Sequence, residues 1–112
     1  MSLKKFMEKI PAVTRGNLML RYFGITNVPM ILFVGPKLLE LNDECCKILI
    51  KLNWRTKNHL NSIYFGAMAV GADVTGGLVA MQEIMNTQKK IHLSFKTFSA
   101  NYLKRAEGDV VF

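Results

Sequence analysis

The fold of this chain is decided by the stretch Ile63-Tyr-Phe-Gly-Ala-Met-Ala-Val-Gly-Ala-Asp73-Val-Thr-Gly-Gly-Leu-Val-Ala-Met-Gln-Glu-Ile-Met85. It contains no proline and has no polar face, and at about twenty residues it is too long for one strand, so it predicts a helix. A helix that is apolar on all sides is predicted to be buried. Its many glycines and alanines would let other parts of the chain approach its backbone closely. Each glycine lowers the helix propensity by roughly 1 kcal/mol relative to alanine, so the close packing should compensate for that loss.

The residues before this helix predict a β-hairpin and a loop. Lys37–Leu41 is a short apolar run, Asn42–Glu44 has the composition of a turn, and apolar residues then alternate with others from Cys46 to Leu52. Alternation with a period of two is typical of a strand, so the two runs should pair across the turn. The polar stretch Asn53–Ser62 is predicted to be a loop.

The first part of the chain, residues 1–34, is predicted to be a helical segment. Apolar residues recur at helical spacing in residues 3–10, and again in residues 18–23. The stretch Val28–Val34 fits either a strand or, because proline suits the first turn of a helix, a short helix that begins near Pro29.

After the long helix the period changes back to two. Apolar residues alternate with polar ones from Ile91, which predicts a strand that runs to about Tyr102, and Val110–Phe112 predicts another strand after a turn. The order of elements indicates an α+β fold in which an antiparallel sheet wraps round a helix. We expect one domain over residues 1–112, since 112 residues are about the size of a single domain.

Composition narrows the class of protein. Fifteen Lys and Arg against eight Asp and Glu give a net charge of +7, which indicates a polyanionic partner. Basic and aromatic residues do not interleave as in nucleic-acid platforms, so we expect no nucleic-acid partner. The adjacent Cys45 and Cys46 form no metal-binding pattern, so we expect no metal site. Asp73 would cost about 2.5–3.5 kcal/mol inside a bilayer and no signal peptide is visible, so we expect a cytoplasmic protein without a membrane span.

Asp73 and the turn before the long helix are the places where chemistry could occur. A carboxylate in an apolar helix must be paired, hydrated or functional. The turn supplies polar side chains, followed by Gly66 where the helix begins. Free N–H groups at a helix N-terminus can stabilise an oxyanion or bind phosphate, although ordinary capping by Asn61 or Ser62 is the commoner arrangement.

At these positions the chain resembles the hot-dog thioesterases of the phenylacetate-degradation group. Their signature is an Asn, a His-Gly-Gly six residues later, and an acid seven residues after the second Gly. Asn58, Gly66 and Asp73 fall in register, whereas Tyr64 and Phe65 replace the His and the first Gly. The resemblance covers residues 35–112. Within the superfamily, this part of the chain is most similar to a poorly characterised bacterial branch.

The resemblance implies a hot-dog fold and hydrolysis of an acyl-CoA thioester at the interface of a homodimer or a dimer of dimers. Asp73 would be the general base or nucleophile, with Asn58 and Gly66 as the other catalytic groups. No separate cofactor is implied, because coenzyme A is part of the substrate. The substrate would also be contacted by Tyr64, Phe65, His59, Lys104 and Arg105.

Two questions stay open at the level of sequence. The aromatic residues in the turn also fit a hot-dog protein that binds an acyl-CoA or acyl chain without cleaving it. The chain predicts fewer strands than a hot-dog sheet contains. We therefore expect Val28–Val34, a partner subunit or strands beyond Phe112 to complete the sheet.

Overall fold

Two strands, β1 (Lys37–Leu41) and β2 (Cys46–Ile50), form the predicted hairpin in the computed structural model, which describes residues 5–6, 9–87 and 90–112. The turn is closed by Asn42, whose Oδ1 accepts the N–H groups of Glu44 and Cys45 at 2.8 and 2.9 Å. A third strand, β3 (Val110–Val111), pairs antiparallel with β2, so the sheet order is β1-β2-β3. The prediction of an α+β fold is thereby confirmed.

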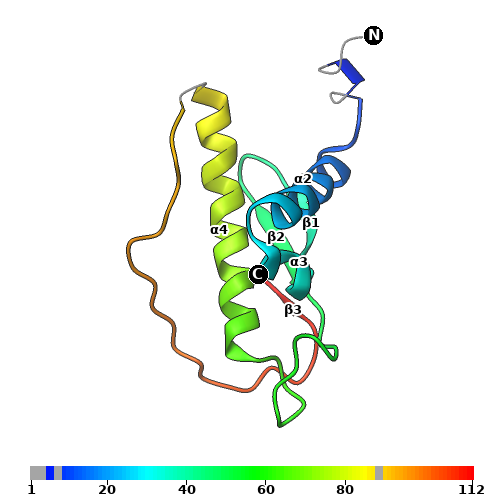
Figure 1. Cartoon of the computed structure of the whole chain (residues 1–112), viewed down its shortest axis with the longest axis vertical. Helices are drawn as coiled ribbons and strands as arrows, with labels where there is room; N and C mark the ends of the chain where they lie inside the picture. Colours follow the sequence, from blue (N-terminus) through cyan, green and yellow to red (C-terminus); the bar gives the residue numbers. More distant parts are fainter. Residues whose placement is uncertain (1–4, 7–8, 88–89) are drawn as a thin grey trace.

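One face of this sheet carries the core. Ile48 and Ile50 are fully buried and lie two residues apart, so they point to the same face, and Leu38 lies opposite Ile48 in the ladder. Helices cover this face, with one layer of helix over one layer of sheet (Figure 1).

The first of these helices, α2 (Ala12–Thr26), packs closely on β1. A Cβ atom at Gly16 would collide with the Leu38 side chain, so glycine permits the close approach. The next residue, Asn17, accepts the Leu38 N–H through its side-chain Oδ1 at 2.8 Å and donates from Nδ2 to the Leu38 carbonyl at 3.0 Å. These contacts fix the position of α2 relative to the sheet.

The stretch that fitted either a strand or a helix is a helix. α3 (Pro29–Val34) has its proline in the first turn and ends at Gly35, whose left-handed φ of 71° favours glycine. The helix predicted at residues 3–10 falls largely outside the described residues, because residues 1–4 and 7–8 are not described.

The long apolar stretch forms α4 (Phe65–Thr87), as predicted, and packs against β2. Its buried residues are Ala67, Gly71 and Val74, all in its first half. The prediction that the helix is buried on all sides is wrong for the single chain, since Val79 and Met85 are 50% and 60% exposed. The sheet covers only part of the helix, and the C-terminal turns extend beyond it (Figure 1).

The strand predicted from Ile91 to Tyr102 is absent. Residues 90–109 form neither helix nor strand and run beside α4, away from the sheet (Figure 1). This segment is tied to the rest at its C-terminal end, where the Ala106 carbonyl accepts the Ile63 N–H and Asp109 Oδ1 accepts the Leu52 N–H, both at 2.9 Å. The sequence of this segment alternates as in a strand, but a strand also needs a neighbouring strand to pair with. Within the described part of the chain, no strand pairs with this segment.

Candidate functional site

Asn58 holds the loop that precedes α4. Its Oδ1 accepts the N–H groups of Leu60 and Ser62 at 2.8 and 3.1 Å, and its own N–H donates to the Ser62 carbonyl at 2.7 Å. Asn61 has a left-handed φ of 57°, which asparagine tolerates, and this closes the tight turn. The side-chain oxygen of Asn58 is therefore occupied, and Nδ2 is the group that it could offer to a ligand.

Gly66 lies in the first turn of α4, which begins one residue earlier. The Tyr64 carbonyl accepts the N–H groups of Ala67 and Met68 at 3.0 and 3.1 Å. Within the described part of the chain, the N–H groups of Phe65 and Gly66 make no hydrogen bond. These two donors, together with the positive end of the helix dipole, could stabilise a developing negative charge on an oxygen atom.

Aromatic rings surround this turn. The rings of Tyr64 and Phe65 are 4.6 Å apart between centroids, and Phe65 meets Tyr102 edge-on at 6.0 Å. A Cβ atom at Gly66 would lie 2.6 Å from the Tyr64 ring, so the ring packs directly over the glycine. Tyr64 and Phe65, which replace the signature's His and first Gly, thus shape the entrance to the free N–H groups.

Asp73 lies two turns further along α4, on the same face as Gly66 because seven residues are close to two helical turns. Its carboxylate is exposed, which explains why a charge is tolerated in an apolar helix. Among the described residues, no hydrogen bond or salt bridge to Asp73 is found. The separation along the helix is roughly 10 Å, so one carbonyl group could not contact both residues of the same chain.

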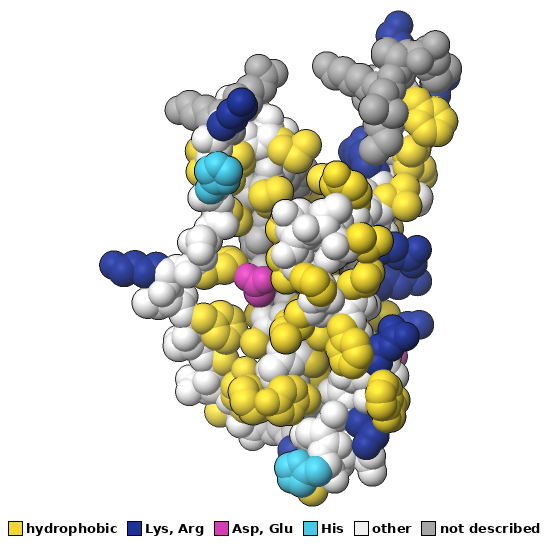
Figure 2. Space-filling model, viewed as in Figure 1, with side chains coloured by type: hydrophobic (Ala, Val, Ile, Leu, Met, Phe, Trp, Pro, Cys, Tyr) yellow, Lys and Arg dark blue, Asp and Glu magenta, His cyan; other side chains and the backbone are white. Residues whose placement is uncertain are grey.

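Asp73 borders an apolar groove of about 850 Å³ between α2, α4 and the segment around Leu93. It is the one charged residue among those that line the groove. Figure 2 shows an acidic side chain among hydrophobic ones on this face of the molecule. The remaining lining residues are Leu18, Met19, Leu20, Tyr22, Phe23, Val28, Ile31, Val74, Gly77, Leu78, Met81, Leu93, Ser94 and Phe95.

The groove was not predicted as a site, although its parts were visible in the sequence. The apolar stripe at residues 18–23 was identified as a helix face that needs covering, and the face of α4 was expected to be buried. Only the structure shows that α2 and α4 lie on either side of one groove.

The other predicted substrate contacts are exposed. His59 lies in the loop turn, and Lys104 and Arg105 lie in the extended segment before β3. Arg105 forms a surface ion pair with Glu107 at 3.4 Å. Their contact with a substrate stays a prediction.

Two kinds of feature are absent from the described part of the chain. No group of three or more His, Cys, Asp or Glu side chains there could hold a metal ion. No helix there is both long enough and apolar enough to cross a bilayer.

The fold and the site define an α+β domain with an apolar groove and a single carboxylate at its side. Residues 16–112 match a family model, and the chain belongs to that family, which is described as a domain of unknown function (DUF4442). No curated protein and no solved structure matches the chain. The matched region contains Asn58, Gly66 and Asp73, so the candidate site lies within the family domain.

Proposed function

We propose that this chain is a hot-dog domain that hydrolyses an acyl-CoA thioester, with the acyl group in the apolar groove. The observation that carries the proposal is the position of Asp73. Its carboxylate has no ion-pair partner among the described residues and lies beside a groove that is otherwise lined by uncharged, mostly apolar side chains. The sequence signature of Asn58, Gly66 and Asp73 supports the same chemistry.

Asp73 would act on the thioester carbonyl through water. The carboxylate takes a proton from a water molecule while the water oxygen bonds to the carbonyl carbon. When the tetrahedral intermediate collapses, the carbon–sulfur bond breaks, and coenzyme A leaves as a thiolate that takes up a proton. The other product is the free acid. Direct attack by the carboxylate would instead form an anhydride, which water then hydrolyses.

The turn before α4 would stabilise the charge that develops on the carbonyl oxygen. The Gly66 N–H is a donor without a partner in the described residues, and it lies at the positive end of the helix. Because Asn58 Oδ1 is occupied by backbone N–H groups, the role of Asn58 would be to donate from Nδ2 to the carbonyl.

The distance between Gly66 and Asp73 requires two copies of the chain. At 1.5 Å per residue the two positions are roughly 10 Å apart on one helix. In a homodimer, or a dimer of dimers, Asp73 of one copy would face the turn of the other. A protein that hydrolyses thioesters as a monomer would contradict this arrangement.

The proposal is tested by measuring thiol release from a panel of acyl-CoA substrates. We expect Asp73→Asn to lower kcat about 100- to 10,000-fold, as for the loss of a general base. Glu83→Gln is the matched control, because Glu83 is an exposed acid on the same helix outside the groove, and it should keep the wild-type rate. Equal rates for wild type and Asp73→Asn would remove Asp73 from the mechanism.

A second candidate function is binding of an acyl chain or acyl-CoA without hydrolysis. It is favoured by Tyr64, which stands where the signature has its histidine. The Tyr64 ring packs over Gly66. Native mass spectrometry of the purified protein would show a retained acyl ligand, and no substrate of the panel would be hydrolysed.

A further inference from the structure

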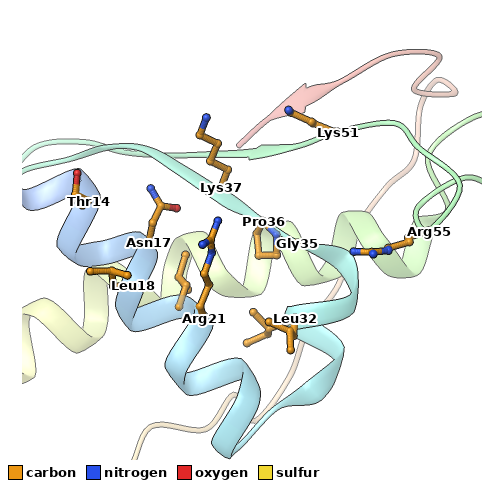
Figure 3. Close-up of a pocket in the computed structure, with 12 residues that line it drawn as sticks. Thr14, Asn17, Leu18, Arg21, Leu32, Gly35, Pro36, Lys37, Lys51 and Arg55 are labelled. Atoms are coloured by element: carbon orange, nitrogen blue, oxygen red, sulfur yellow. The ribbon is translucent and has the colours of Figure 1, made fainter.

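A second cavity, of about 630 Å³, lies on the other side of α2 from the groove. It is bounded by α2, by the end of α3 and by the start of β1, and the chain after β2 closes one side (Figure 3). Leu18, Leu20 and Ile31 line both cavities, so the two are neighbours that share a wall.

This second cavity is positively charged. The cationic residues that line it are Arg21, Lys37, Lys51 and Arg55. No acidic residue belongs to the lining, and none of the four cations forms an ion pair with any described residue. Two other surface cations are paired, Lys47 with Glu40 at 3.2 Å and Arg105 with Glu107 at 3.4 Å. Cations that share a cavity repel one another, and a bound anion would relieve that repulsion.

The arginines are held by structured parts of the chain. Asn17, which is bonded to the Leu38 backbone, lies one turn before Arg21 on the same face of α2. In Figure 3, Arg21 extends from α2 toward Pro36, and Arg55 extends toward the cavity from the loop after β2. The Arg55 N–H donates to Asn53 Oδ1 at 2.9 Å, and the Arg55 guanidinium lies 6.0 Å from the centre of the Phe33 ring.

We propose that this cavity, with Arg21 and Arg55 as its main contacts, binds the phosphate groups of coenzyme A. Guanidinium groups present a planar fork of donors that matches phosphate oxygens, and lysines add positive charge. The choice of coenzyme A rests on the proposed function, because the neighbouring groove would take the acyl end of the same molecule. This assignment differs from the sequence expectation that Lys104 and Arg105 contact the substrate, since neither residue lines the cavity.

The test is a calorimetric titration with adenosine 3′,5′-bisphosphate, which carries phosphates but no acyl group. We expect Arg21→Gln and Arg55→Gln each to raise the Kd about tenfold or more. Lys47→Gln is the matched control, because it removes one charge at the turn end of the hairpin from a residue that does not line the cavity, and its Kd should equal that of the wild type. Both arginines are exposed, so the substitutions should leave the fold intact. A thermal unfolding curve of each variant is the check that it folds.

Two results would overturn the proposal. One is absence of binding to the wild-type protein at low ionic strength. The other is a Kd that rises in Lys104→Gln or Arg105→Gln while Arg21→Gln and Arg55→Gln bind normally. Inorganic phosphate is titrated as a separate arm. Competition by phosphate at the same concentration as the bisphosphate would show that the cavity recognises an isolated anion and not the nucleotide end of coenzyme A.

A thioester substrate without phosphates tests the phosphate site and the proposed hydrolysis independently. An acyl thioester of N-acetylcysteamine has no phosphates, so the arginine variants should hydrolyse it at the wild-type rate but show a lower kcat/KM with acyl-CoA. If no thioester is hydrolysed while the bisphosphate binds through Arg21 and Arg55, the hydrolase proposal fails and the phosphate site stands.

Discussion

At the scale of single residues, hydrogen bonding distinguishes the polar groups that stabilise this fold from those that are available for chemistry. Asn58 was expected to act on a substrate, and the structure shows that its side-chain oxygen also holds the loop. Asp73 makes no such bond within the described residues, and its exposure leaves it open to water and ligand. Asn58→Ala would therefore disturb the loop as well as the site, whereas Asp73→Asn tests chemistry alone.

Two buried hydroxyl groups in the same loop allow a sharp test of hydrogen bonding. Thr56 Oγ1 donates to the Lys51 carbonyl at 2.6 Å and accepts the Asn53 N–H at 3.0 Å. The Ser62 Oγ is also buried but has no hydrogen-bond partner among the residues that the structure describes. We expect Thr56→Val to lower the free energy of unfolding by about 1–3 kcal/mol, because it removes two part-buried hydrogen bonds to the backbone of Lys51 and Asn53.

The matched variant at the second hydroxyl should behave differently. Ser62→Ala removes a polar group that gains nothing from burial, so the free energy of unfolding should be unchanged or rise by about 1 kcal/mol. Urea denaturation of both variants provides the measurement. A loss in Ser62→Ala as large as that in Thr56→Val would mean that the serine hydroxyl has a partner in solution.

At the scale of elements, local sequence signals were sufficient for the hairpin and for α4. An asparagine turn between two short apolar runs needs only neighbouring residues to form, and so does a long apolar helix without proline. The strand at residues 91–102 could not be decided in this way, because pairing depends on an edge supplied from elsewhere in the fold. The same reason applies to the candidate sites. The spacing from Asn58 to Asp73 is local in sequence, but Arg21 and Arg55 come to line one cavity only through tertiary packing.

Two glycines of α4, Gly71 and Gly77, differ in the space that a side chain would find there. A Cβ atom at Gly71 would lie 2.5 Å from the Phe112 ring, whereas at Gly77 it would meet nothing within 4 Å. Phe112 is anchored to Ile48 by two backbone hydrogen bonds of 2.8 and 3.0 Å, so its ring can shift only at a cost in packing. Gly77→Ala should raise the free energy of unfolding by up to about 1 kcal/mol through helix propensity.

Gly71→Ala should gain the same propensity but lose more through overpacking, which typically costs about 1–3 kcal/mol. We therefore expect it to unfold at a lower urea concentration than both Gly77→Ala and the wild type. If the two alanine variants were equally stable, the close contact between α4 and Phe112 would be wrong.

At the scale of the whole molecule, much apolar surface remains exposed in the single chain. It includes the far half of α4 and the alternating residues of the extended segment, where Ile91 and Phe95 are 52% and 53% exposed. Apolar surface of this extent is typical of a protein that associates. The two-copy arrangement that the proposed chemistry needs would cover part of it.

Hydrogen exchange connects this association to the missing strand. In the monomer, the backbone N–H groups of residues 91–102 have no strand partner, so we expect them to exchange at nearly the rate of an unfolded chain. The N–H groups within β2 should stay protected, because both neighbouring strands pair with it. If a second copy supplies the missing edge, protection of residues 91–102 should rise with protein concentration, in step with the dimer fraction measured by sedimentation. Strong protection of this segment at concentrations where the protein is monomeric would mean that it pairs within one chain, contrary to the structure.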